Sequence, residues 1–358
     1  MIGIAPERTA PDSPSPGRDL GVDLAKAVAI LLVLAGHLTL FAYDSSGPSL
    51  TSRAMHLLVD GSYAWVIPTA VPTFFLVSSI LYLRSRSRGP ALARRAKRTG
   101  LALLAWMAVQ FALVAAYTRS LPEVTWLTLR VGGPTFDGRG APALYFLVDL
   151  MLLYVVLEGL ARVRAAWGEG AARRLGAFVV TCYAIAFLAL PVVGVRSVML
   201  WSFWPFAVYP FLAVLLDSGV PRSRLAVASA CVYVAAIAWE LLLTTRLPGF
   251  ELVSLGALYY ARLPLTAGAA LVYLAAGELA GRAARALTSF SRLGTWTLGV
   301  FIVHPYFIFF LKPILKPLRI VAPGGTLLLD LSLAVAVVAL TAVVVFALAR
   351  TPLKFMVK

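Results

Sequence analysis

Long apolar runs alternate with short polar segments along the whole chain. Ten of the runs have about 19 residues or more and few charges, which is the length an α-helix needs to cross the hydrocarbon core of a bilayer. The pattern predicts an all-α, polytopic membrane helix bundle of about ten transmembrane helices. The predicted spans are residues 22–43, 63–83, 99–118, 142–161, 175–194, 197–216, 225–243, 252–280, 293–311 and 326–349.

Two segments depart from this pattern. Residues 1–17 are rich in Pro and Ser and predict a disordered tail, which leaves residues 18–358 as one membrane domain. The run 252–280 is long for a single span and contains Arg262 and Pro264. We therefore expect it to be tilted, kinked or partly outside the membrane.

The charges orient the predicted bundle. The chain is 60% hydrophobic with a net charge of +16, and its cations lie in short segments between apolar runs, where they act as topology signals rather than as nucleic-acid contacts. One side of the bundle carries 21 Lys and Arg residues and the other carries nine. This bias predicts a multi-pass protein of the plasma membrane with both termini in the cytoplasm.

The first predicted span carries three polar side chains on one face. Asp23 lies three residues before Lys26, and His37 lies eleven residues after it. Eleven residues are about three full helical turns, so the three side chains share a face, with Lys26 and His37 roughly 16 Å apart along the axis. Ionisable groups within a membrane usually mark function. An interfacial ion pair of Asp23 with Lys26 and a packing role for His37 are the alternatives.

Two further polar side chains lie at a depth similar to that of His37. His304 and Asp149 each lie about seven residues from the predicted outer ends of their spans. A neutral imidazole can act as a general base, and a carboxylate can orient it. We therefore regard His37, His304 and Asp149 as candidate catalytic residues, although each is also compatible with helix packing.

On the predicted cytoplasmic side of the bundle, the candidate residues for binding an anionic donor substrate are Lys26, Asp23 and Arg98. Arg98 ends a basic segment at residues 84–98, where cations can hold phosphates, although most of them are expected to be topology signals. Glu158 is expected to be solvated at a helix end. Glu240 and Arg262 both fall in the outer half, where an ion pair between them is one arrangement to test.

An ordered set of motifs resembles the acyltransferase-3 family of integral-membrane O-acyltransferases. Lys26 and His37 match its first motif, a basic residue followed by ten residues and a His, in the form typical of the sugar acetylase branch. The segment VPTFFLVSSILY resembles a Phe-Phe-x-x-Ser-Gly motif with Ser79 in place of Gly, and ALYFLVDLMLLY resembles a Trp-Phe-Leu motif with Tyr145 in place of Trp. LGTWTLGVFIVHPYFI keeps the His-Pro of the last motif but has Thr297 and Phe301 at two substituted positions.

The resemblance implies transfer of an acyl group, with acetyl expected, from acyl-CoA to a hydroxyl of a carbohydrate or glycosylated acceptor, with no metal. It implies that Lys26 and Arg98 meet the donor and that His37 activates the acceptor. The polar residues within the spans leave two alternatives open. One is a transporter or flippase of a lipid-linked or polar substrate, and the other is an inactive scaffold.

Overall fold

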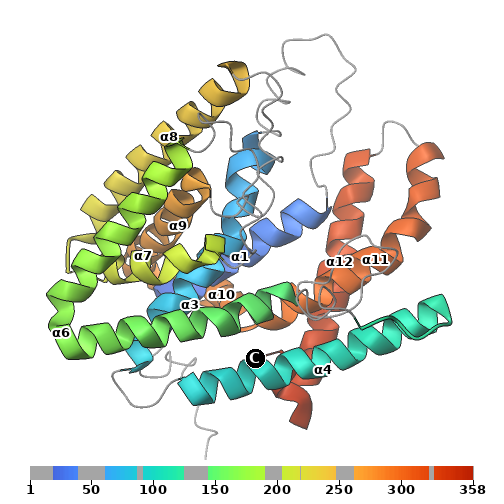
Figure 1. The fold of residues 1–358 in the computed structure, drawn as a ribbon. Helices are drawn as coiled ribbons and strands as arrows, with labels where there is room; N and C mark the ends of the chain where they lie inside the picture. Colours follow the sequence, from blue (N-terminus) through green and yellow to red (C-terminus); the bar gives the residue numbers. More distant parts are fainter. Residues whose placement is uncertain are drawn as a thin grey trace, which may run out of the picture.

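The described part of the chain is helical throughout. The computed structural model describes residues 19–38, 61–86, 92–124, 144–189, 204–217, 219–246, 262–321 and 326–357, so the predicted tail 1–17 lies outside it. Within these residues there are ten α-helices and no strand (Figure 1). The α-helices are α1 Leu20–Leu38, α3 Ala70–Arg86, α4 Leu92–Thr118, α6 Tyr145–Ala189, α7 Val208–Leu216, α8 Arg222–Arg246, α9 Leu263–Arg282, α10 Ala284–Ser291, α11 Thr297–Val321 and α12 Thr326–Ala349.

Shorter helical turns complete several of these elements. The π-helix η1 (Ser62–Val66) and the 3₁₀ turn η2 (Ile67–Thr69) lead directly into α3. The 3₁₀ turns η3 (Trp204–Ala207) and η5 (Arg292–Thr295) precede α7 and α11, and η6 (Pro352–Met356) follows α12.

The membrane character predicted from the sequence is confirmed in its coarse form. Five helical segments of the described residues are long and apolar enough to cross a membrane: α1, the segment from η1 through α3, α4, α8 and α9. A sixth arises if α10–η5 and α11, which meet at a bend of 67°, form one broken span. The predicted total of about ten spans and the cytoplasmic termini stay predictions.

The fourth and fifth predicted spans are two helices that meet directly at a kink at Gly168, without the loop expected between them, and α6 names the two together. Helix α6 continues from Tyr145 to Ala189 and departs from helical geometry at Gly168, with φ 80° and ψ 170°. The intervening residues are mostly Ala and Arg, which are strong helix formers, and they contain no Pro. The long helix and its bend are visible in Figure 1.

Only parts of the sixth and eighth predicted spans lie within the described residues. Helix α7 has nine residues and is therefore roughly 14 Å long, less than the thickness of a hydrocarbon core. Helix α9 begins at Leu263, with Pro264 in its first turn, where a missing N–H costs nothing. The rest of the predicted span 252–280 before Arg262 lies outside the described residues.

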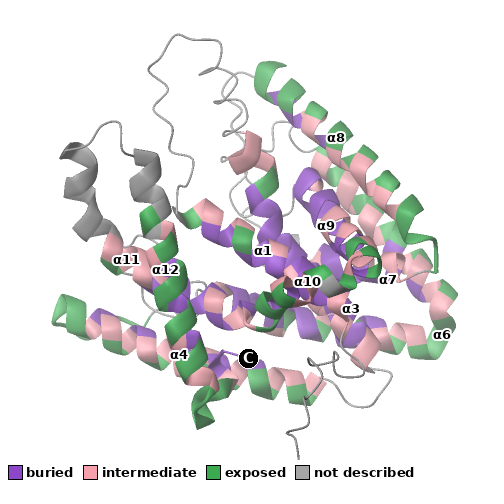
Figure 2. Ribbon diagram, turned by 180° about the vertical axis from the view of Figure 1, so that it is seen from behind, coloured by how far each residue is buried: buried purple, intermediate pink, exposed green. Residues whose placement is uncertain are grey.

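The interior of the bundle is built around α3 and α9. Helix α1 packs against both of these helices and against α10, η5 and α11. Figure 2 shows long buried stretches on α1, α3 and α9, whereas α8 and α12 leave much of their surfaces exposed. The helices that carry the predicted site residues therefore converge on one interior region.

Candidate active site

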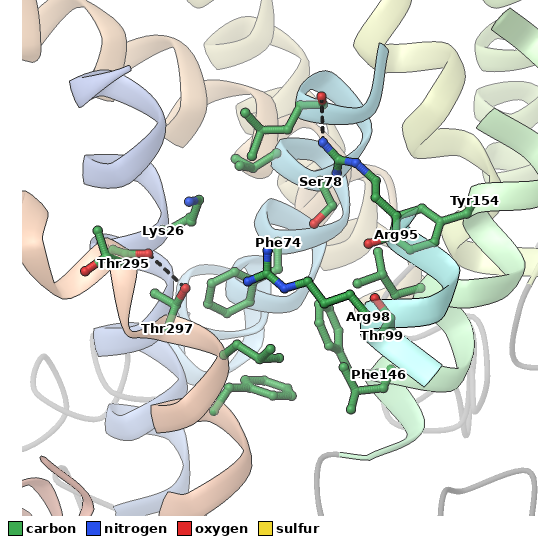
Figure 3. A pocket seen from close by; sticks show the side chains of 17 residues that line it. Lys26, Phe74, Ser78, Arg95, Arg98, Thr99, Phe146, Tyr154, Thr295 and Thr297 are labelled. Carbon is green, nitrogen blue, oxygen red and sulfur yellow. Dashed lines mark hydrogen bonds between the residues drawn. The ribbon is translucent and has the colours of Figure 1, made fainter. Parts of the chain in front are cut away.

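A pocket of about 380 Å³ opens between α1, α3, α4, α6 and the segment from η5 into α11. Three cations line it: Lys26 from α1 and Arg95 and Arg98 from α4 (Figure 3). Hydroxyl groups from five elements add hydrogen-bonding capacity, and they belong to Ser78, Thr99, Tyr154, Thr295 and Thr297. The pocket thus combines positive charge with neutral donors, the chemistry that holds phosphate groups.

Lys26 is held by the carboxylate predicted to pair with it. Its Nζ lies 3.0 Å from Asp23 Oδ1, and the two side chains are 22% and 10% exposed. Gly294 of η5 packs directly on the backbone of Asp23, and a Cβ at that position would overlap it. Because Gly294 and its neighbours Thr295 and Thr297 line the pocket beside Lys26, this close approach brings η5 to the cation.

Arg98 and Arg95 reach the pocket from the first two turns of α4. The Arg98 residue is otherwise exposed, as expected for a cation at an open mouth. Arg95 Nη2 donates to the Leu81 carbonyl oxygen at 2.9 Å and to Ser85 Oγ at 3.1 Å, which ties α4 to the end of α3. Most cations of the basic segment are expected to be topology signals, and Arg95 is one that also contacts the pocket.

Glu158 is buried, and the expectation that it is solvated is wrong. It is 8% exposed, and its Oε2 accepts a hydrogen bond of 2.8 Å from the Tyr82 hydroxyl. The Tyr82 ring in turn stacks on Tyr154 at 5.6 Å and lies 5.4 Å from the Arg95 guanidinium. Glu158 becomes internal because α6 packs against α3, which brings Tyr82 to its carboxylate.

Three phenylalanines close the pocket at its other end. The rings of Phe74, Phe146 and Phe301 contact one another in pairs, with centroid distances of 5.0 Å, 5.7 Å and 6.1 Å. All three line the pocket and come from α3, α6 and α11. We call these residues the phenylalanine cluster. One turn further along α11, His304 lies 6.2 Å from the Phe301 ring.

The two predicted histidines meet beyond the phenylalanine cluster. The His37 and His304 ring centroids are 5.2 Å apart; we call the two residues the histidine pair. His304 is fully buried, whereas His37 is exposed in the structure. His304 Nδ1 lies 2.7 Å from the Val300 carbonyl oxygen, which can only accept, so Nδ1 carries the proton. Nε2 of the neutral ring then presents a lone pair, and it is buried without a hydrogen-bond partner among the described residues.

The remaining predicted site residues have defined positions. Asp149 is fully buried on α6, three residues after Phe146 of the phenylalanine cluster. Its role as an orienting carboxylate stays a prediction. Ser79 is also fully buried and donates to the Phe75 carbonyl oxygen at 2.8 Å, whereas its neighbour Ser78 faces the pocket. Within the described ranges, no three His, Cys, Asp or Glu side chains group as metal ligands.

The arrangement separates two chemical environments along the same helices. Cations lie at one end of the pocket, and an imidazole pair lies past an aromatic cluster at the other. The spacing of Lys26 and His37 in the sequence indicates both the cationic environment and the imidazole environment. The contributions of Arg95 and the phenylalanine cluster depend on tertiary packing, and their only sequence signal is the basic segment and the aromatic residues beside the motifs.

Comparison with known proteins identifies the chain at the level of a family. A family model described as an acyltransferase domain matches residues 19–350. The match covers nearly the whole chain and includes both the cationic pocket and the histidine pair. No curated protein and no solved structure matches the chain.

Proposed function

The chain belongs to the acyltransferase-3 family, and on this premise we propose that it transfers an acyl group, expected to be acetyl, from acyl-CoA to a hydroxyl of a carbohydrate or glycosylated acceptor at the plasma membrane. The observation that carries the proposal is the pairing of a cationic pocket with a histidine pair along the same helices. Acyl-CoA has phosphates at one end and a thioester at the other, so its use as a donor requires both a cationic site and a proton-transfer site.

The cationic end supports binding of the donor. Lys26, Arg95 and Arg98 supply positive charge, and Ser78 and Thr99 supply hydroxyls beside them. Charge-assisted hydrogen bonds to phosphate are stronger than neutral ones. We assign the donor phosphates to these cations, with Asp23 holding Lys26 in place.

The apolar end supports passage of the acyl group. Phe74, Phe146 and Phe301 line the pocket, and the Phe301 ring lies 6.2 Å from His304 of the histidine pair. The pantetheine arm of the donor passes these rings, which brings the thioester towards His37 and His304. Exclusion of water from this region limits hydrolysis of the thioester.

The histidine pair supports proton transfer. A neutral imidazole takes the proton of the acceptor hydroxyl as its oxygen attacks the thioester carbonyl carbon. The tetrahedral intermediate collapses and the carbon–sulfur bond breaks. The imidazolium then gives its proton to the departing sulfur, so that coenzyme A leaves as the thiol and the imidazole is neutral again. His37, which is accessible, is assigned as the base, and His304 is assigned to stabilise or relay charge from its buried position. Asp149 is proposed to support them from α6.

The test is transfer by purified protein with the substitution His37→Ala. Wild-type protein should transfer the acyl group from donor to acceptor, and the variant should lose at least about 10²-fold in kcat, whereas donor affinity should stay the same. A wild-type rate in the variant would refute the assignment of the base. Mass spectrometry of glycans from cells with and without the protein should reveal an acceptor heavier by one acyl group.

An assay of the wild-type protein in proteoliposomes distinguishes acyl transfer from transport. Wild-type protein in proteoliposomes should modify the acceptor only when an acyl donor is present. Movement of unmodified substrate without any donor would instead support a transporter or flippase.

A further inference from the structure

A second buried polar cluster lies outside the pocket, between α8, α9 and η1. Glu240 on α8 and Arg262 at the start of α9 form an ion pair in which Nε donates to Oε1 at 2.7 Å and Nη2 donates to Oε2. The two side chains are 1% and 0% exposed. The ion pair that the sequence left open is therefore present and completely enclosed.

Stability alone explains such a pair poorly. Removing two charges from water is costly, and a buried ion pair often contributes no more to stability than apolar side chains of the same volume. Its geometry is nevertheless specific, because both charges also bind η1. Arg262 Nη1 donates to the Ala64 carbonyl oxygen at 3.0 Å, and Trp65 Nε1 donates to Glu240 Oε2 at 2.7 Å.

The segment held in this way packs against the end of α1. A Cβ on Gly36 would lie 2.6 Å from Ile67 Cγ2, so α1 and η2 are as close as a glycine permits. In addition, the Tyr63 hydroxyl lies 3.5 Å from the Ala35 carbonyl oxygen. Gly36 and Ala35 are the two residues before His37, in the last turn of α1.

The last turn of a helix needs external support because its carbonyl groups have no partners within the helix. We propose that the Glu240–Arg262 ion pair, together with Trp65, positions His37 by holding η1 and η2 against the last turn of α1. These residues do not touch the pocket, so they are positioning residues and not catalytic ones. The catalytic consequence rests on the function proposed above, whereas the positioning itself does not.

The sharpest variant is Trp65→Phe, which removes the indole N–H and keeps an aromatic ring. The matched control is Trp239→Phe, because Trp239 is the neighbour of Glu240 and its Nε1 is buried without a hydrogen-bond partner among the described residues. A second variant, Arg262→Lys, keeps the charge but cannot bind both oxygens and Ala64 at once. It tests the same idea if the tryptophan variant folds poorly.

Two readouts distinguish positioning from general packing. The first is steady-state kinetics: a displaced His37 lowers kcat, by about tenfold or more, and leaves the KM for the donor within about twofold. The second needs no activity. The chain has three histidines, so ¹⁵N-histidine labelling gives a simple spectrum in which His37→Ala identifies the His37 signals.

The proposal expects Trp65→Phe and Arg262→Lys to shift the His37 imidazole signals and to lower kcat, and Trp239→Phe to do neither. Unchanged His37 signals in both test variants would overturn it, as would equal effects in the control. If wild-type protein shows no acyl transfer but the His37 signals still shift, the proposed function fails and the positioning stands. If wild-type protein transfers but the test variants match it in kcat and spectrum, only the positioning fails.

Discussion

Substitution of Lys26 by Ala should weaken donor binding by more than the loss of one cation. Lys26 Nζ lies 3.0 Å from Asp23 Oδ1, and Asp23 is 7% exposed. The substitution therefore removes a partner for phosphate and also leaves a buried carboxylate without that cation. Both effects oppose an anionic donor, and they can be separated by substituting Asp23 as well.

The magnitude follows from the geometry of the pair. A charge-assisted hydrogen bond to phosphate contributes about 2 kcal/mol. A phosphate oxygen on the far side of Nζ would lie roughly 6 Å from the Asp23 carboxylate, where the repulsion at an effective dielectric constant near 20 is roughly 3 kcal/mol. Together these give about 5 kcal/mol, which raises Kd by roughly three to four orders of magnitude. The double variant Lys26→Ala/Asp23→Asn should lose only the first contribution and bind the donor roughly 10²-fold better than Lys26→Ala.

The assay is isothermal titration calorimetry of acetyl-CoA and of free coenzyme A into detergent-solubilised protein. A fall in the salt dependence of Kd should accompany the loss of the cation, because exposed electrostatic contacts are screened. The reasoning would be refuted if Lys26→Ala bound either ligand like the wild type. It would also be refuted if the double variant bound no better than Lys26→Ala, since the Asp23 charge would then be irrelevant to the donor.

Three other predictions concern the pocket and its supports. His304→Ala should lower the single-turnover rate constant about 10²-fold or more, with unchanged donor affinity because His304 does not line the pocket; an unchanged rate constant would exclude a role in catalysis. Ser78→Trp should fill the pocket and abolish coenzyme A binding in calorimetry while thermal unfolding remains cooperative, and retained binding would place the donor elsewhere. Glu158→Ala should leave the buried Tyr82 hydroxyl without its 2.8 Å partner and lower stability by about 1–3 kcal/mol, seen as a lower melting temperature, whereas an unchanged melting temperature would contradict this.

The predicted neighbours at the site follow from helix geometry alone. His37 and His304 lie at similar distances from the outer ends of their predicted spans, so their depths could be compared without a fold, and the structure places their rings 5.2 Å apart. Lys26 and Arg98 are both predicted near the cytoplasmic ends of their spans, and both line the pocket. Their catalytic and binding roles, and that of Asp149, stay predictions.

Other features depend on contacts that no local pattern encodes. Arg95 lies in a basic segment in which a topology signal and a pocket cation look alike, because both are Arg residues at a helix start. Glu158 becomes internal because α6 packs against α3, where the Tyr82 hydroxyl donates to its carboxylate. The partner of Arg262 could not be assigned from sequence, since Glu240 lies on a different helix.

The phenylalanine cluster has a consequence for the electrical insulation of the membrane. A protein that passes part of a charged cofactor deep into a bilayer risks opening a path for protons and ions, which would dissipate the transmembrane potential. The mutual contacts of Phe74, Phe146 and Phe301 leave apolar rings where a conducting path would need a continuous column of water. Rings that separate only while the donor's arm passes and then return to contact would keep the barrier intact between turnovers. Replacing them with small residues should therefore raise the proton and ion permeability of vesicles that contain the protein.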